Sequence, residues 1–126
     1  IRRRDSLERV TTDHSMVESL VLAGIIPREA AICHEDRSRL EQAIGVAGDF
    51  SPSLNRRKLD DGDRVLLCSD GLWEPVGDDG IAEVLASDGS MRQLATVLAD
   101  RALAAGGPDN ITAVVYEHRG SNPRLR

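Results

Sequence analysis

The sequence predicts an α+β domain in which an antiparallel β-sheet packs against helices. Residues 64–69 and residues 110–118 are apolar, and the second segment is rich in β-branched side chains, which is typical of strands. Between them, apolar residues recur at helical spacing, and this pattern predicts an amphipathic helix that packs on the sheet. A chain of 126 residues has the length of one small domain with its own core.

The segment before residue 56 is predicted to contain only short elements. These are two strands within residues 1–11, a helix over 16–23, a helix restarting at Pro27, a helix or turn over 36–45 and a strand or loop over 45–55. Asp13 or Ser15 is placed to cap the first helix, and Gly24 is placed to end it.

The segment after residue 56 carries the stronger patterns. Asp61-Gly62 is a tight-turn signal, and the continuous apolar run over 64–69 predicts a strand that is buried on both faces. A helix is predicted from about Asp79 to Ala86, and a longer one follows Ser90, its N-cap. The apolar face of the longer helix comprises Met91, Leu94, Ala95, Leu98, Ala102 and Leu103. Residues 121–126 read as a polar tail.

The composition argues against several classes of function. A formal net charge of -5 and a pI near 5.1 argue against a nucleic-acid binder, which is usually basic. No apolar run reaches the ~20 residues that span a membrane. Cys33 and Cys68 lie far apart and make no disulfide framework, which predicts a reduced, cytoplasmic protein.

An aspartate stands at an irregular end of each strong strand. Asp70 follows the first strand in "CSDG", and Asp109 precedes the second in "GGPDN". If the two strands are antiparallel neighbours, both carboxylates lie at the same edge of the sheet. Carboxylate oxygens suit Mg²⁺ or Mn²⁺, and a pair of such ions can activate a water for attack on a phosphate. Taken alone, each segment is better explained as an ordinary turn, and only the presence of both at matching strand ends favours a metal site.

Four segments of the chain resemble the metal-dependent protein phosphatases, the type 2C serine/threonine phosphatase family. They are "LERVTTDHS", "HEDRSRLEQAIG", "DRVLLCSDGLWEPV" and "GGPDNITAVVY", in the family's order and covering nearly the whole chain. The similarity is greatest to the compact bacterial members. It implies a hydrolase with an α-β-β-α sandwich and a dinuclear Mn²⁺ or Mg²⁺ centre. There a metal-bridging water attacks the phosphoserine or phosphothreonine of a protein substrate.

The resemblance also implies roles for individual residues. Asp70 and Asp109 correspond to catalytic metal ligands, and Gly71 and Asn110 shape the loops around them. Residues from about 13 to 45 correspond to the family's flap, which lies beside the site and is suited to substrate choice. Residues 1–120 as a whole correspond to the C-terminal portion of the phosphatase domain.

The family's earlier acidic motifs are absent from these 126 residues. We therefore expect half of a metal site, little or no phosphatase activity from this polypeptide by itself, and an exposed apolar sheet face. Such a face predicts a dimer or a complementing N-terminal half. The alternative function is that of a non-catalytic, truncated phosphatase-like domain that binds proteins.

Other noticeable side chains are interpreted as structural. The residues in question are His14, His34, His118, Cys68, Trp73 and the basic segment 56–58, with Trp73 expected to anchor the strand end by packing. The remaining acids near the strands are expected to serve turns and helix starts, not a metal: Asp60, Asp61, Asp63, Asp78 and Asp79.

Overall fold

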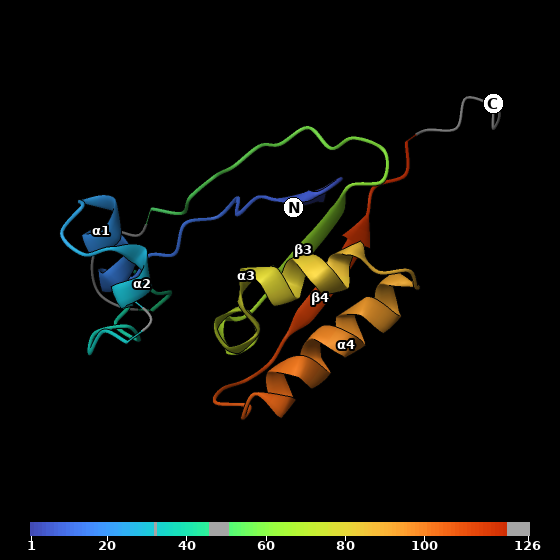
Figure 1. The fold of residues 1–126 in the computed structure, drawn as a ribbon. Coiled ribbons are helices and arrows are strands. Elements are labelled where there is room, and N and C mark those ends of the chain that lie inside the picture. The colour runs from blue at the N-terminus through green and yellow to red at the C-terminus, as the bar shows by residue number, and fades with distance from the viewer. Residues whose placement is uncertain (32, 46–50, 121–126) are drawn as a thin grey trace. The chain divides into compact units, whose positions relative to one another are not determined.

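The computed structural model describes residues 1–31, 33–45 and 51–120 (Figure 1). Its elements are β1 (Arg2–Arg3), β2 (Ser6–Leu7), α1 (Met16–Leu22), α2 (Arg28–Ala31), β3 (Arg64–Cys68), α3 (Asp70–Ala86), α4 (Met91–Ala104) and β4 (Ala113–Glu117). The chain divides into two compact units, one formed by Ile1–Arg9 with the chain from Arg57 onward and the other by Val10–Arg56. The predicted α+β class with an antiparallel sheet is confirmed.

The first unit is built on a sheet with the strand order β2-β1-β3-β4, in which every pairing is antiparallel. β3 and β4 pair along their full length, from Arg64 opposite Glu117 to Cys68 opposite Ala113. The predicted pairing of the two strong strands is therefore confirmed, although β4 is shorter than the predicted range 110–118. Because the strands run in opposite directions, the end of β3 lies beside the start of β4.

α3 and α4 cover one face of this sheet (Figure 1). The core that they form with the sheet consists of Leu72, Ile81, Val84, Leu85, Leu94, Leu98 and Ala102. Ser90 begins α4 with a capping box to Gln93, so the predicted N-cap is confirmed. Leu103 was predicted on the apolar face but is 61% exposed, because it points away from Leu94 on the circumference of the helix.

The opposite face of the sheet is apolar and exposed. Leu67, Val114 and Tyr116 lie on it with 63%, 53% and 52% of their surface in water. The prediction that residues 64–69 are buried on both faces is wrong for the described chain. Successive side chains of a strand alternate between faces, and only the face under α3 and α4 is covered here. The exposed apolar face expected of half a domain is thus present.

α3 begins at Asp70, well before the predicted start at Asp79. Its backbone is non-helical at Gly77, with φ 71° and ψ 164°, and the part after this kink matches the predicted helix. The earlier part was not predicted because Gly71 and Pro75 disfavour helix. Tertiary packing overrides this local preference, since Leu72 in this part is completely buried.

The second unit contains α1 and α2. Ser15 caps α1 by accepting a hydrogen bond from the amide of Glu18 at 3.3 Å. Gly24 follows the helix with φ 69°, a conformation that favours glycine, so the predicted start and end of α1 are confirmed. Arg28 of α2 donates to both carboxylate oxygens of Glu18, at 3.0 and 2.8 Å, which holds the two helices together.

The rest of the second unit is irregular. Of the helix or turn predicted over 36–45, the turn is present, at residues 36–38 and 44–45, and Leu40 makes an isolated β-bridge to Ser15. Part of the predicted strand or loop over 45–55 lies outside the described residues, as does the predicted tail 121–126. The expected flap of about 13–45 falls within this unit, and its role as a flap stays a prediction.

Candidate metal centre

The loops that carry Asp70 and Asp109 are joined through Ser69. The Oγ of Ser69 donates to the carbonyl oxygen of Asn110 at 2.8 Å and accepts a hydrogen bond from the amide of Thr112 at 3.0 Å. The amide of Ser69 donates to the carbonyl of Thr112 at 3.2 Å. These bonds extend the β3–β4 pairing beyond the strands and hold the two loops against each other.

The backbone at Gly71 approaches the other loop so closely that no side chain fits there. A Cβ atom at this position would lie 2.5 Å from the carbonyl oxygen of Asn110 and 3.1 Å from the carbonyl carbon of Asp109. Glycine is needed here because the first turn of α3 contacts the loop of Asp109 and Asn110 so closely, and not because of its backbone conformation, which is helical. The structure therefore brings Asp70, Gly71, Asp109 and Asn110 together at one edge of the sheet.

The carboxylates of Asp70 and Asp109 are both exposed, and each is oriented by the next amide along the chain. The Oδ1 of Asp70 accepts from the amide of Gly71 at 2.8 Å, and the Oδ1 of Asp109 accepts from the amide of Asn110 at 2.7 Å. Asp70 is also the first residue of α3, where the positive end of the helix dipole stabilises a negative charge. Two oxygen donors are thus presented to solvent from adjoining loops.

This pair of donors suits Mg²⁺ or Mn²⁺, which bind carboxylate oxygens in proteins. Two carboxylates alone do not complete the set of ligands that such an ion needs. Among residues 1–31, 33–45 and 51–120, no group of three or more His, Cys, Asp and Glu side chains is arranged to hold a metal ion. Asp70 and Asp109 are thus two of the donors that such a site would need, and their role as metal ligands stays a prediction.

Trp73 lies in the first turn of α3 and packs partly against the core. The guanidinium of Arg9 lies 4.8 Å from the centre of its ring, and the same guanidinium is 3.8 Å from the carboxylate of Asp78. These contacts agree with the predicted packing role of Trp73. Sequence reasoning missed Arg9, because no local pattern links it to Trp73. It also missed Ser69, because its bonds to Asn110 and Thr112 join segments about 40 residues apart and leave no local pattern.

Asp63 is buried, which corrects its interpretation as an ordinary turn acid. Its side chain is 2% exposed, and Arg3 donates three hydrogen bonds to its carboxylate at 2.6 to 3.1 Å. These bonds, and one from the amide of Asp60, lower the pKa of Asp63 to about 2. Asp63 precedes β3 and Asp70 follows it, so this ion pair belongs to the other end of the strand.

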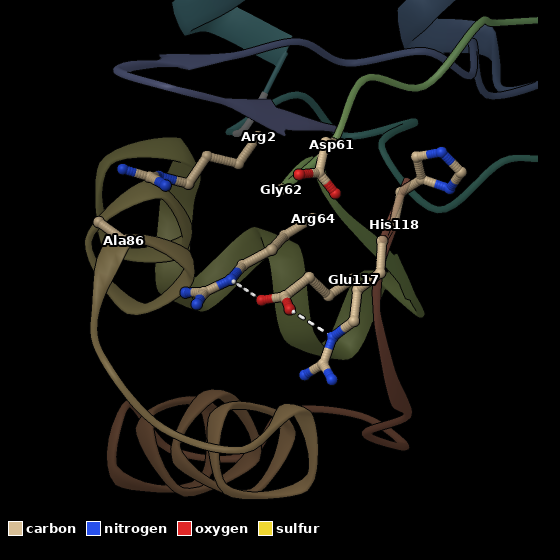
Figure 2. A pocket seen from close by; sticks show the side chains of 8 residues that line it. Arg2, Asp61, Gly62, Arg64, Ala86, Glu117 and His118 are labelled. Carbon is tan, nitrogen blue, oxygen red and sulfur yellow. Dashed lines mark hydrogen bonds and ion pairs between the residues drawn. The ribbon is translucent and has the colours of Figure 1, made fainter. Parts of the chain in front are cut away.

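A hollow of about 470 Å³ lies at this other end of the sheet (Figure 2). It is lined by Arg2, Asp61, Gly62, Arg64, Ala86, Glu117, His118 and Arg119. Glu117 accepts hydrogen bonds from Arg119 and Arg64, each at 3.1 Å, and these bonds lower the pKa of its carboxyl. Arg64 also donates to the carbonyls of Leu85 and Ser87 at the end of α3. Arg64, Glu117 and Arg119 therefore form hydrogen bonds that stabilise the fold. The hollow lies at the opposite end of β3 from Asp70.

The three histidines each contact a polar group, and their structural interpretation stays a prediction. The Nε2 of His14 lies 2.9 Å from the Oγ of Ser53, and the Nδ1 of His34 accepts from the amide of Asp36 at 3.1 Å. The Nδ1 of His118 lies 3.4 Å from the hydroxyl of Tyr116.

Comparison with known proteins shows what the chain is similar to. No family model matches the chain. The chain is 41% identical over 128 residues to the serine/threonine protein phosphatase PstP of Mycobacterium tuberculosis, which covers 98% of the chain and 24% of PstP. It is 36% identical over 113 residues to a putative protein phosphatase 2C-type of Streptococcus pyogenes, which covers 90% of the chain and 46% of that protein.

Solved structures of bacterial serine/threonine phosphatases are similar as well. The serine/threonine phosphatase of S. agalactiae superposes with a TM-score of 0.86 at 35% identity, over 92% of this chain and 48% of the other. PstP of M. tuberculosis superposes with a TM-score of 0.84 at 39% identity, over 93% of this chain and 49% of the other. A structure of the PstP catalytic domain in complex with two manganese ions superposes with a TM-score of 0.79 at 37% identity, over 91% of this chain and 46% of the other.

The chain is homologous to part of the bacterial type 2C serine/threonine phosphatases, and the resemblance inferred from its sequence is confirmed. It spans about half the length of the solved relatives and about a quarter of PstP. In the part of the chain that the structure describes, no helix is long and apolar enough to cross a membrane.

Proposed function

We propose that the chain forms part of a metal-dependent serine/threonine protein phosphatase. The observation that carries the proposal is the junction through Ser69 of two loops that each bear an aspartate. Relatives named as protein phosphatases in Mycobacterium and Streptococcus support the same activity. The proposed substrates are proteins phosphorylated on serine or threonine.

Asp70 and Asp109 are proposed to hold Mn²⁺ or Mg²⁺. The two manganese ions in the related PstP catalytic domain support a dinuclear centre. When bound, such ions supply an activated water for direct attack on a phosphate. The chain itself holds the carboxylates in place, because the amides of Gly71 and Asn110 each orient one oxygen.

The other metal ligands are proposed to come from sequence outside residues 1–126, in another segment or another chain. The exposed sheet face of Leu67, Val114 and Tyr116 supports this proposal. Removing apolar surface from water stabilises a protein by about 25 cal/mol per Å², so further protein on this face would be favourable. The chain would then correspond to the C-terminal portion of a larger domain, or pair with a second copy.

The test is hydrolysis of a phosphothreonine peptide with and without Mn²⁺. The chain of residues 1–126 should release little phosphate, whereas the full-length product should be active with Mn²⁺. Asp70→Ala in the full-length product should lower the rate roughly 100-fold or more, since one electrostatic group at a reacting centre contributes about that factor. Asp79→Ala, which removes an exposed acid farther along α3, is the matched control and should leave the rate unchanged.

Two results would contradict the proposal. One is a full-length product with no Mn²⁺-dependent hydrolysis. The other is a full-length Asp70→Ala variant that keeps the wild-type rate.

A non-catalytic protein-binding domain is the second candidate function. It is favoured by the incomplete set of metal donors in the described residues and by the exposed apolar face. The genomic sequence upstream of Ile1 distinguishes the two. An Asp-Gly-x-Gly-Gly segment there supports the enzyme, and a start codon near Ile1 supports the binding domain. The cytoplasmic location expected from the cysteines stays a prediction.

A further inference from the structure

We propose that Ser69 is a positioning residue for the metal centre, whose hydroxyl sets the spacing between the loops of Asp70 and Asp109. This inference rests on the proposed function, because it assigns a role at the same site. Ser69 would touch neither metal nor substrate. It would act through the two backbone segments that it joins.

The hydroxyl of Ser69 is directed at the opposite loop and not at its own helix. Ser15 and Ser90, which also directly precede helices, accept hydrogen bonds from amides in the first turns of those helices. Ser69 precedes α3 with the same extended backbone, yet within the described chain its side chain makes no capping bond to α3. Its Oγ instead contacts Asn110 and Thr112 across the sheet edge.

The position of these bonds relative to the aspartates makes them suited to set ligand spacing. Asp70 follows Ser69 in the sequence, and Asp109 precedes Asn110. The carbonyl of Asn110 accepts the hydrogen bond from the hydroxyl of Ser69. The hydroxyl therefore connects the two residues that adjoin the candidate ligands. Because it donates to one backbone group and accepts from another, it fixes the opposite loop at two points.

Close packing increases the effect of this contact. A Cβ atom added at Gly71 would lie 2.5 Å from the carbonyl oxygen of Asn110, so the backbone of this loop lies too close to Gly71 for any side chain. Without the hydroxyl, the carbonyl of Asn110 and the amide of Thr112 lose their partner, and the loop can shift away from α3. The separation of the two carboxylates would then change, and a metal centre depends on the positions of its ligands.

The test uses the full-length product and measures Mn²⁺ binding by calorimetric titration, independently of catalysis. Ser69→Ala should weaken Mn²⁺ binding by about tenfold or more, the range seen when groups that orient metal ligands are removed. Ser69→Thr, which keeps the hydroxyl, should bind Mn²⁺ close to the wild-type affinity. Phosphopeptide hydrolysis should then require correspondingly more Mn²⁺ for Ser69→Ala.

Ser87→Ala is the matched control. The Oγ of Ser87 donates to the carbonyl of Val84 at 2.7 Å, at the far end of the same helix. This variant also removes one serine hydroxyl bonded to backbone at an end of α3, so it should change the melting temperature without changing Mn²⁺ affinity. If Ser69→Ala does not fold, Ser69→Cys replaces it, because a thiol has a similar shape but is a weaker hydrogen-bonding group.

The outcomes separate this inference from the proposed function. Wild-type Mn²⁺ affinity in Ser69→Ala, or in Ser69→Cys, together with lost affinity in Asp70→Ala, would overturn the role of Ser69 alone. Wild-type Mn²⁺ affinity in Asp70→Ala would overturn the metal site itself. An equal loss of affinity in Ser69→Ala and Ser87→Ala would show a general effect of stability and would also overturn the positioning role.

Discussion

Arg3 donates to both carboxylate oxygens of Asp63 and thereby ties β1 to the turn that leads into β3. The same guanidinium donates to the carbonyl of Lys58 at 2.8 Å. The backbone carbonyl of Asp63 accepts from the amide of His118 at 2.8 Å, just after β4. Three distant parts of the chain meet at this pair, and the ionised Asp63 has the partners that a buried carboxylate needs.

The stability of the first unit is therefore expected to fall in acid. The pKa of Asp63 is about 2 in the folded chain, against an ordinary value of 3.8. A carboxyl with a lowered folded-state pKa contributes stability above its unfolded pKa, and this contribution is lost as the pH falls from about 4 to about 2. Thermal melts between pH 7 and pH 2 measure the effect.

Asp63→Asn isolates the contribution of this one carboxyl. Glu83 and Glu117 also have lowered pKa values, caused mainly by hydrogen bonds from arginines, and they add loss of stability in the same direction. The variant should melt at a lower temperature at pH 7 and lose less stability in acid than the wild type. Parallel pH curves for the two proteins would contradict the role of Asp63.

Gly71→Ala is expected to destabilise the protein even though alanine favours helix by about 1 kcal/mol over glycine. The new methyl group would overlap the carbonyl of Asn110, and backbone cannot move aside as easily as a side chain. Overpacking of this kind typically costs about 1–3 kcal/mol. Urea denaturation measures the change.

Gly80→Ala is the control for helix propensity. Its Cβ would lie 2.9 Å from Cγ1 of Val76, which would have to shift, and 3.8 Å from the guanidinium of Arg101, so the contacts are with side chains and not with the backbone of another segment. We expect a smaller loss of stability than for Gly71→Ala, because a side chain moves aside more easily than backbone and alanine favours the helix. Stabilisation of both variants would mean that the close contact at Gly71 carries no energetic consequence.

The contact between Arg9 and Trp73 is expected to stabilise the first turn of α3 by about 0.5–1 kcal/mol, the range for a partly exposed cation–π pair. A double-mutant cycle with Arg9→Gln and Trp73→Leu measures the coupling directly. Arg9→Lys, which keeps the charge, should retain part of the coupling. Additive effects of the two single substitutions would rule out the interaction.

The exposed sheet face is expected to make residues 1–126 self-associate when no further protein covers it. Replacing Leu67 and Val114 with threonine keeps strand propensity while making the face more polar, so it should shift the chain toward monomer. Sedimentation velocity at several concentrations measures this shift. Val97→Thr is the control, because Val97 is 42% exposed on α4, away from the sheet face.

A monomeric wild-type chain at all concentrations would contradict this prediction. So would an equal effect of the Val97 control on self-association.

Several elements were predictable because their signals are local. The cap of α4 at Ser90 and the helical spacing of the apolar residues that follow it lie within one short segment. The apolar runs of β3 and of β4 are likewise each contained in a short segment. The start of α3 was not predictable, because Gly71 and Pro75 disfavour helix and only the burial of Leu72 overrides them. One-sided burial of β3 also depends on which layers cover the sheet.

By itself, the sequence determined that Asp70 and Asp109 stand beside two strong strands, and so identified them as the candidate site. Only the tertiary structure decided that Ser69 joins their loops, that Gly71 leaves no room between them and that Asp63 is buried. The physical reason is the range of the interactions. Strand and helix signals arise between neighbours in sequence, whereas these contacts join residues that meet only when the sheet has formed.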